Sequence, residues 1–391
     1  MYSTSLVEKI KWSLPWLVRY PQWRFGELVR RLRDGSGLAH VIILVANHYE
    51  PGLGPIALRR VERWCELARA TGNAVRDHDG TPFRHTNFFP AEQYEAQLIE
   101  PLADLQNDGY GEVEIHLHHG IERADTAENT QKMIEAFRDN LAYKHRCLSK
   151  ETPDSIPRYA FVHGNWALAN SAGGRYCGVD SEMRILADTG CYADFTLPSA
   201  PDESQVPKIN SIYVCGNPLS EARPHRSGPD IRVGGRIDHP ILVEGPLVFD
   251  WTRRVRGFPV PRIDDGGLAA NYPLNLNRFQ RWRKANISVR GRPDWIFIKL
   301  YSHGFFDHDQ DTMIGGELMR LMEQVFELGE RSGKFKIHFA STREAYNMIV
   351  AAVDGKFGDP NRFRNYRLRE IMREDSRVGS SLPAEFTQSL N

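Results

Sequence analysis

Three histidines lie within four positions of the segment "EVEIHLHHG" (residues 112–120), at the end of a stretch typical of a buried strand. A buried imidazole must find a hydrogen-bond partner or lose solvation free energy, so this concentration calls for an explanation. One explanation is a polar strand end that faces water. The other is a metal site, because histidine is the commonest metal ligand among side chains.

Three further predicted strands end in side chains of the same kind. The strands at 37–51, 158–166 and 294–304 finish in "NHYE", "HGNW" and "YSHG". In open parallel sheets and in (β/α) barrels, functional side chains collect at the carboxyl ends of the strands. We therefore expect these polar residues to meet on one rim of the fold.

The alternation of side chains along a strand indicates which of these polar residues point in the same direction. Residues i and i+2 of a strand share a face, so His116 and His118 point together, as His48 and Glu50 do if the strand continues that far. Two imidazoles and a carboxylate are a common catalytic zinc ligation, with a water of pKa about 7 at the fourth position. A histidine beside it can act as general acid or base. We predict a divalent metal, zinc, held by Glu50, His116 and His118, with His48, His163 and His303 as catalytic candidates.

Each of these assignments has a structural alternative. His116 is deep enough in its strand to be a core histidine bonded to Glu114 or to a backbone carbonyl. His119 is expected to face solvent or to cap the following turn. His48 can be a ligand, a base or a group that orients Glu50, and His163 can simply shape a turn.

Apolar periodicity alternates between strand-like and helix-like segments along most of the chain, which predicts an α/β fold with a parallel sheet. Thr126 is a predicted helix cap. The region 200–290 breaks this rhythm and predicts long loops with antiparallel strands. The predicted strands are 37–51, 83–90, 112–119, 158–166, 191–201, 294–304 and 334–341, and the predicted helices are 57–72, 91–109, 126–145, 181–190, 315–333 and 342–355.

Composition narrows the class of protein. The chain has 391 residues, of which 41% are hydrophobic and 26% charged, as in soluble globular proteins. Its 50 basic residues balance 50 acidic ones, so no net field attracts nucleic acid. Five cysteines without a CxxC pair favour a reducing, cytoplasmic compartment, and the chain lacks an apolar run long enough to span a membrane.

The first 35 residues differ from the rest, with seven Lys and Arg against three Asp and Glu, and with three tryptophans interleaved. Such a segment can make peripheral contact with a membrane surface or pack as a helix across the domain. Pro15 and Pro21 interrupt a long amphipathic face and favour packing. We predict a basic N-terminal helical extension at 1–36, a barrel domain at 37–355 that includes the 200–290 insertion, and a polar tail at 356–391. The tail is expected to be loosely attached or disordered beyond about 375.

The strand-end motifs resemble those of the polysaccharide deacetylase superfamily, metal-dependent hydrolases on a distorted (β/α) barrel of about seven parallel strands. "EVEIHLHHG" is similar to the family's metal-binding strand, whose first zinc histidine falls on His118, and "RHTNFFPAEQY" to its second strand. "VANHYEPG" occupies the place of the first motif and puts the metal-binding carboxylate on Glu50. "LYSHG" puts the acid on His303, and "FVHGNW" lies where the third motif shapes the groove. The resemblance spans roughly residues 38–350, with 200–290 unmatched.

The chain departs from the family at two positions. His48 replaces the expected base aspartate. The second zinc histidine would fall on Glu122, so His116 takes its place, as in variants that have His-x-His.

The resemblance implies metal-dependent removal of an N-acetyl group from an amino sugar in a polysaccharide or a lipid-linked glycan. Two other functions remain open. One is a non-catalytic glycan-binding or scaffold protein on the same barrel, and the other is glycosidic cleavage by paired carboxylates drawn from Glu50, Asp194 and Asp250. The oligomeric state is not predicted.

Overall fold

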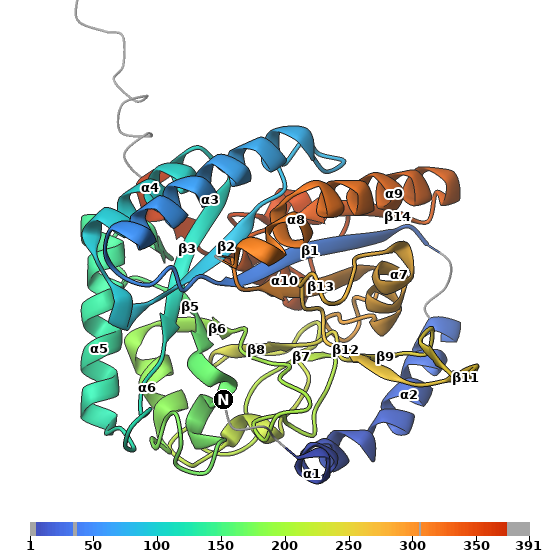
Figure 1. The fold of residues 1–391 in the computed structure, drawn as a ribbon, viewed down its shortest axis with the longest axis horizontal. Coiled ribbons are helices and arrows are strands. Elements are labelled where there is room, and N and C mark those ends of the chain that lie inside the picture. The colour runs from blue at the N-terminus through green and yellow to red at the C-terminus, as the bar shows by residue number, and fades with distance from the viewer. Residues whose placement is uncertain (1–4, 34–36, 305, 374–391) are drawn as a thin grey trace, which may run out of the picture.

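One curled, mostly parallel sheet organises the fold (Figure 1). The computed structural model describes residues 5–33, 37–304 and 306–373. The strand order is β13-β1-β2-β3-β5-β6-β8-β7, and β14 pairs with the first half of β1. The nine strands of this sheet are β1 (Ala39–His48), β2 (His85–Pro90), β3 (Gly111–Leu117), β5 (Tyr159–His163), β6 (Cys191–Asp194), β7 (Ser211–Tyr213), β8 (Ile241–Glu244), β13 (Trp295–Ser302) and β14 (Phe335–Phe339).

Ten α-helices and several short elements accompany the sheet. The helices are α1 (Leu6–Leu17), α2 (Tyr20–Arg33), α3 (Gly54–Ala74), α4 (Ala96–Asn107), α5 (Ala127–Asp139), α6 (Glu182–Thr189), α7 (Leu276–Ala285), α8 (Gln310–Ile314), α9 (Gly316–Ser332) and α10 (Thr342–Val353), as counted over the described ranges. The short strands are β4 (Ser149–Lys150), β9 (Val248–Asp250), β10 (Arg254–Val255), β11 (Phe258–Pro259), β12 (Arg262–Asp264) and β15 (Arg369–Glu370). The single-turn elements are η1 (Ala91–Gln93), η2 (Asn140–Lys144), η3 (Gly164–Trp166), η4 (Leu168–Asn170), η5 (Pro224–Arg226), η6 (Asp307–Asp309), η7 (Pro360–Phe363) and η8 (Ile371–Arg373).

The predicted α/β class and parallel sheet are confirmed. Each predicted strand and helix outside the insertion has a counterpart, and Thr126 accepts the hydrogen bond from the Asn129 N–H that caps α5. Within the described residues, β7 and β8 are the one antiparallel pair of this sheet, and no ladder joins β13 to either of them. The sheet is therefore a curled half-barrel, and the count of seven strands in a barrel is not confirmed.

The insertion contributes to the sheet more than its sequence predicts. Its β8 pairs in parallel with β6, whereas β9–β12 and β10–β11 are antiparallel pairs outside the sheet, as predicted for this region. Lys299 of β13 crosses the interior of the half-barrel and donates to the carbonyl oxygens of Phe195, at 2.8 Å, and Leu197. Burial lowers the pKa of Lys299 to about 8, against the raising effect of Glu244 and other acidic groups. This contact joins β13, at one edge of the sheet, to the segment that follows β6.

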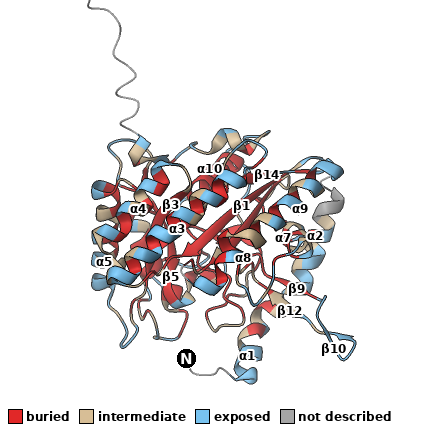
Figure 2. Ribbon diagram, turned by 45° about the horizontal axis from the view of Figure 1, so that its top comes forward, coloured by how far each residue is buried: buried red, intermediate tan, exposed pale blue. Residues whose placement is uncertain are grey.

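The last helix closes the amino-terminal end of the half-barrel. Every residue of α10 is buried, as Figure 2 shows together with the buried strands around it. The Thr342 N–H in its first turn donates to the Thr86 hydroxyl oxygen of β2, and the ring of Tyr346 lies 4.7 Å from that of Tyr192 in β6. With one end closed in this way, the carboxyl ends of the strands remain as the accessible rim.

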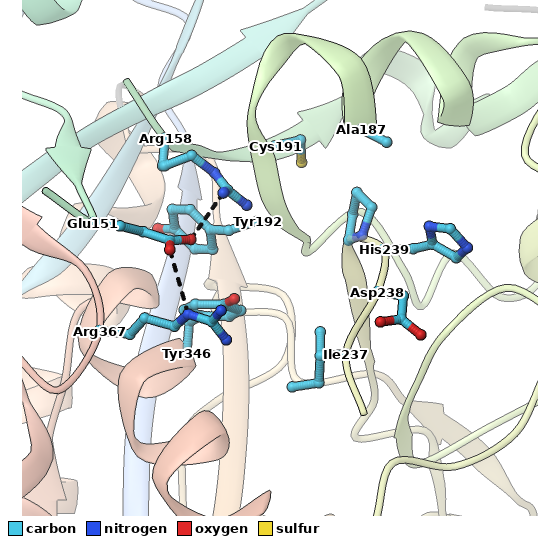
Figure 3. A pocket seen from close by; sticks show the side chains of 11 residues that line it. Glu151, Arg158, Ala187, Cys191, Tyr192, Ile237, Asp238, His239, Tyr346 and Arg367 are labelled. Atoms are coloured by element: carbon cyan, nitrogen blue, oxygen red, sulfur yellow. Dashed lines mark hydrogen bonds and ion pairs between the residues drawn. The ribbon is translucent and has the colours of Figure 1, made fainter. Parts of the chain in front are cut away.

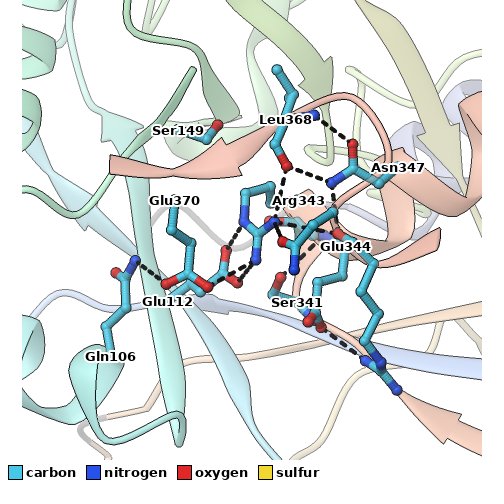
Figure 4. Close-up of polar contacts among 12 residues, drawn as sticks. Gln106, Glu112, Ser149, Ser341, Arg343, Glu344, Asn347, Leu368 and Glu370 are labelled. Atoms are coloured by element: carbon cyan, nitrogen blue, oxygen red, sulfur yellow. Dashed lines mark hydrogen bonds and ion pairs between the residues drawn. The ribbon is translucent and has the colours of Figure 1, made fainter. Parts of the chain in front are cut away.

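A buried ion cluster fixes α10 to β3 and to the segment that follows it (Figure 4). Arg343 donates to Glu112 at the start of β3, at 2.8 and 3.2 Å, and to Glu370 at 3.1 Å. Asn347 exchanges hydrogen bonds with the backbone of Leu368. Residues 359–373, which the sequence assigned to a polar tail, are thus attached to the domain. The remainder of that tail, 374–391, lies outside the described residues.

The N-terminal extension forms two helices, α1 and α2, that contact Phe249 of β9 (Figure 1). Trp16 is buried and its ring lies 5.5 Å from that of Phe249 in β9, within a small second core that also contains residues of the insertion. One face of α1 is nevertheless open to solvent. Its exposed apolar residues are Leu6, Val7, Ile10 and Leu14. In the described ranges, no helix combines the length and the apolar character needed to cross a bilayer.

The Arg343 cluster yields a stability prediction. Replacing Arg343 by Met leaves Glu112 buried without its cation, which costs about 3–5 kcal/mol for a broken buried pair. The double variant Arg343→Met/Glu112→Met removes both charges and is expected to recover most of that loss. Urea denaturation of the three proteins measures both effects. Equal stabilities of the single and double variants would contradict this account.

Candidate metal centre

Strand register brings the predicted ligands to one rim. His48 lies opposite Phe88, Phe88 lies opposite Glu114, and Pro90 lies opposite His116, so His48 and His116 project from the same, inner face of the sheet. β3 ends at Leu117, and His118 follows it directly. Glu50 comes two residues after the end of β1. These residues meet at the carboxyl end of the half-barrel.

Glu50, His116 and His118 converge on one point. The Glu50 Oε1 atom lies 3.3 Å from His116 Nε2 and 3.6 Å from His118 Nε2, and the two imidazole centroids are 4.5 Å apart. Metal–nitrogen and metal–oxygen bonds of 2.0–2.2 Å in a tetrahedron place ligand atoms roughly 3.3–3.6 Å from one another. The observed separations fit such a cation without rearrangement.

The opposite ring nitrogens of both histidines already have acceptors. His116 Nδ1–H donates to the carbonyl oxygen of Val162 at 2.7 Å, and His118 Nδ1–H donates to the carboxylate of Glu92 at 2.6 Å. With the proton on Nδ1, each neutral imidazole has a lone pair on its Nε2 atom, and both Nε2 atoms face Glu50. Outer partners of this kind orient metal-binding histidines and set their tautomer.

The three ligand side chains differ in their exposure to solvent. The side chain of His116 is 1% exposed, that of His118 15% and that of Glu50 25%. Three protein ligands with an open side is the arrangement of catalytic metal sites, in which substrate or water takes the remaining position.

Two more imidazoles lie beside this group. The His48 ring centroid is 5.3 Å from that of His116 and 5.0 Å from that of His303, and ligand atoms of His48, His303 and Glu50 fall within 4.8 Å of one another. Burial and the nearby His303 and His116 hold the pKa of His48 well below its usual value. Burial also lowers the pKa of His303. The pKa of Glu50 is lowered, because its contacts with His116 and His118 outweigh the opposing effect of burial.

Glycines allow the close packing that holds this rim. A Cβ atom on Gly164 would collide with the imidazole of His118, and one on Gly304 would collide with the side chain of Asn47. Asn47 in turn donates to Asn87 at 3.0 Å and accepts from the Ser302 hydroxyl at 2.9 Å. The loop after β5 and the ends of β1, β2 and β13 are thereby fixed around the site.

His163 does not join the other predicted residues. In the ladder between β3 and β5, His163 lies opposite Leu117, so its side chain projects from the face opposite that of His116. Its Nε2 atom lies 3.0 Å from His119 Nε2 and 3.2 Å from Glu182 Oε1. His163 is therefore separate from the rim group, and the expectation that His119 faces solvent or only caps a turn is wrong.

His119, His163, Cys177 and Glu182 form a second group that can hold a metal ion. All four are buried, and their ligand atoms lie within 4.8 Å of one another. Burial acts to lower the pKa of His119, but hydrogen bonds with Cys177 and Glu182 outweigh it and raise the pKa to about 9. Burial and Glu182 would raise the pKa of Cys177, yet its bonds with the two histidines lower it.

Three residues of these groups escaped prediction. Cys177 was one of five cysteines without a recognisable spacing, Glu182 opens a predicted helix, and Glu92 follows a predicted strand. The alternation of side chains along β3 could have indicated part of the second group from the sequence. His119 is two residues after Leu117 and shares its face, which is also the face of His163.

A cavity of about 240 Å³ lies at the other end of the sheet (Figure 3). Its lining includes Arg158, Tyr192 and Pro240, at the amino ends of β5, β6 and β8. Its cation Arg158 is paired with Glu151 at 2.9 Å, and Arg367 approaches the same carboxylate at 3.6 Å. The cavity is remote from both histidine groups and adds no residue to them.

Comparison with known proteins does not assign the chain to a family. No model of a known protein family matches it, and no curated protein sequence matches it. The resemblance to polysaccharide deacetylases therefore rests on the motifs at the strand ends.

The outer partner of His118 generates a binding prediction. Glu92→Gln weakens the charge-assisted bond that orients His118, and loss of such a partner lowers metal affinity roughly 10–100-fold. His118→Ala removes a ligand and is expected to weaken rim binding further. Titration of metal-stripped protein with Zn²⁺ measures both, and Glu66→Gln, an exposed carboxylate on α3, is the control. Unchanged affinity in His118→Ala would refute the assignment.

Proposed function

We propose that this protein is a metal-dependent hydrolase that removes N-acetyl groups from amino sugars of a polysaccharide or a lipid-linked glycan. The observation that carries the proposal is the convergence of Glu50, His116 and His118 at the open rim, with His48 and His303 beside them. The motif resemblance supports the same reaction and a deacetylase-like barrel. Because the open rim holds nitrogen and oxygen donors, we propose zinc as its metal.

The residues present at the rim fit a hydrolytic cation. When bound, a divalent cation there supplies a Lewis acid that polarises a carbonyl oxygen and makes water more acidic. His116 and His118 are held for binding by their bonds to Val162 and Glu92. Glu50 completes the ligand set and leaves the solvent side free for an acetamido group.

The two remaining histidines divide the proton transfers. Hydrolysis of an N-acetyl group adds water across the C–N bond and yields acetate and an amine. His48 occupies the place of the family's base aspartate and would accept the proton of the attacking water. His303 would deliver a proton to the departing nitrogen. Both lie close enough to Glu50 to serve one reacting centre.

The two other functions predict different products. Glycosidic cleavage needs a second carboxylate across the scissile bond. Asp194 instead binds Thr196, and Asp250 binds Thr252 and Tyr272, so neither is grouped with Glu50. A glycan-binding scaffold would hold sugar without turnover and without metal. The arrangement of the rim favours deacetylation over both.

We also propose that the protein acts in the cytoplasm, at a membrane surface that it reaches through α1. The exposed apolar side chains of this helix are accompanied by the exposed Lys9 and Lys11. An apolar stripe flanked by cations suits the boundary of an anionic bilayer. Such contact would bring the rim to lipid-linked substrates.

Activity measurements test the proposed reaction. Purified protein with Zn²⁺ is expected to release acetate from N-acetylglucosamine oligomers. His303→Ala and His48→Ala are each expected to lower kcat roughly 10²–10⁴-fold, the usual contribution of a general acid or base. His239→Ala, an exposed histidine beside the remote cavity, is the matched control and should retain full activity.

Product identity separates the possibilities. Shortened glycan without acetate would establish glycosidic cleavage instead, and metal-independent glycan binding without any product would support the scaffold. Acetate release that survives Glu50→Gln and His118→Ala would refute the proposed site.

Membrane contact is tested by co-sedimentation with phosphatidylserine vesicles. Ile10→Glu places a charge on the apolar stripe and is expected to weaken binding roughly tenfold, since burial of one such side chain contributes about 1.5–3 kcal/mol. Phe357→Glu alters an apolar residue outside α1 that is even more exposed than Ile10, and this variant should bind like the parent protein. Equal binding by Ile10→Glu and the parent would contradict the role of α1.

A further inference from the structure

The buried group of His119, His163, Cys177 and Glu182 brings two imidazole nitrogens into direct contact. His119 Nδ1–H donates to the Asp125 carboxylate at 2.9 Å, and His163 Nδ1–H donates to the Gly164 carbonyl oxygen at 2.6 Å. As neutral rings the two imidazoles would present lone pairs at Nε2, and these nitrogens are only 3.0 Å apart. A lone pair facing a lone pair is repulsive unless a cation or an added proton lies between them.

Glu182 places a carboxylate at the same point. Its Oε1 atom lies 2.9 Å from His119 Nε2 and 3.2 Å from His163 Nε2. Its other oxygen accepts from the Ala169 N–H at 2.6 Å and lies 3.6 Å from the sulfur of Cys177. Four donor atoms from four segments of the chain thus surround one point.

Another close histidine pair shows how the same contact is satisfied by hydrogen bonds alone. His40 Nδ1 lies 2.8 Å from His338 Nε2, and His338 Nδ1–H donates to Asp79 at 2.7 Å. His40 can place its own proton on Nδ1 and donate it to His338, so the pair is complete. In the buried group both Nδ1–H groups donate to other acceptors, so the contact between the two Nε2 atoms needs a cation or an added proton.

We propose that His119, His163, Cys177 and Glu182 bind a second, structural zinc ion, distinct from the metal at the rim. Two imidazole nitrogens, a thiolate and a carboxylate are all ordinary zinc ligands, and four protein ligands make a closed tetrahedral site. The sulfur donor distinguishes zinc from Mg²⁺ or Ca²⁺, which take oxygen ligands. The ligands are fully buried, so the site has no position for substrate.

The zinc ion would fasten an irregular segment to the sheet. From η3 to the start of α6 the backbone of five non-glycine residues lies in the left-handed region, which costs free energy that surrounding contacts must offset. These residues are Asn165, Trp166, Ala169, Asn170 and Tyr176. The Cys177 carbonyl oxygen accepts from the Asp125 N–H at 2.8 Å, and a Cβ on Gly120 would collide with the Cys177 backbone. Because Gly164 at the start of this segment packs on His118, the structural zinc would also steady the rim.

Cobalt substitution tests the proposal independently of activity. The full chain is stripped with chelator and reloaded with Co²⁺. A thiolate ligand gives a sulfur-to-cobalt charge-transfer band, whereas the rim group contains no sulfur. We expect the band in the parent protein and in His118→Ala, and its loss in Cys177→Ser. Cys215→Ser, a buried free cysteine outside the group, should keep it.

Zinc content gives the second readout. The parent protein is expected to hold about two zinc ions per chain, Cys177→Ser about one and His118→Ala about one, since each variant loses one ligand of a different site. A cobalt-loaded, folded parent without the band would overturn the structural zinc site. Two ions retained in Cys177→Ser would also overturn it. Loss of the band in Cys177→Ser with no acetate release by the parent would leave this site standing and refute the proposed function instead.

Discussion

The hydrogen-bonded register between β3 and β5 decides where the candidate ligands go. Leu117 lies opposite His163, so alternation sends His116 and His118 to the inner face and His119 to the outer face with His163. A slip of one residue would move each side chain to the other face. Two groups of opposite character, one open and one closed, therefore depend on the same ladder.

The rim group and the buried group differ in solvent exposure, and this difference decides whether a substrate can reach a bound metal ion. At the rim, Glu50 keeps a quarter of its side chain exposed and the ligands number three, so a reactant can approach. In the second group, four ligands are enclosed by the outer face of the sheet, α6 and the segment before it. A cation there can support the fold, but it cannot meet a polymer. This contrast follows from the face of the sheet: the rim group lies on the inner face at the accessible end, and the second group lies on the outer face under a helix.

The sequence predicted the parts that depend on one strand at a time. Continuous apolar runs identified the parallel strands, and alternation within β3 paired His116 with His118. The position of His163 apart from the rim group could not be predicted, because the register between two strands cannot be inferred from either strand alone. Cys177 and Glu182 could not be predicted from spacing, since a segment with left-handed residues and the start of α6 bring them to the sheet. The parallel strand β8 was missed because it is short and lies among loops.

A zinc-edge anomalous difference map from crystals of the full chain, grown with Zn²⁺, tests the central claim most directly. We predict a peak about 2.0–2.2 Å from the Glu50 carboxylate and from the Nε2 atoms of His116 and His118. A map with zinc bound elsewhere on the chain and none between these three side chains would contradict the account.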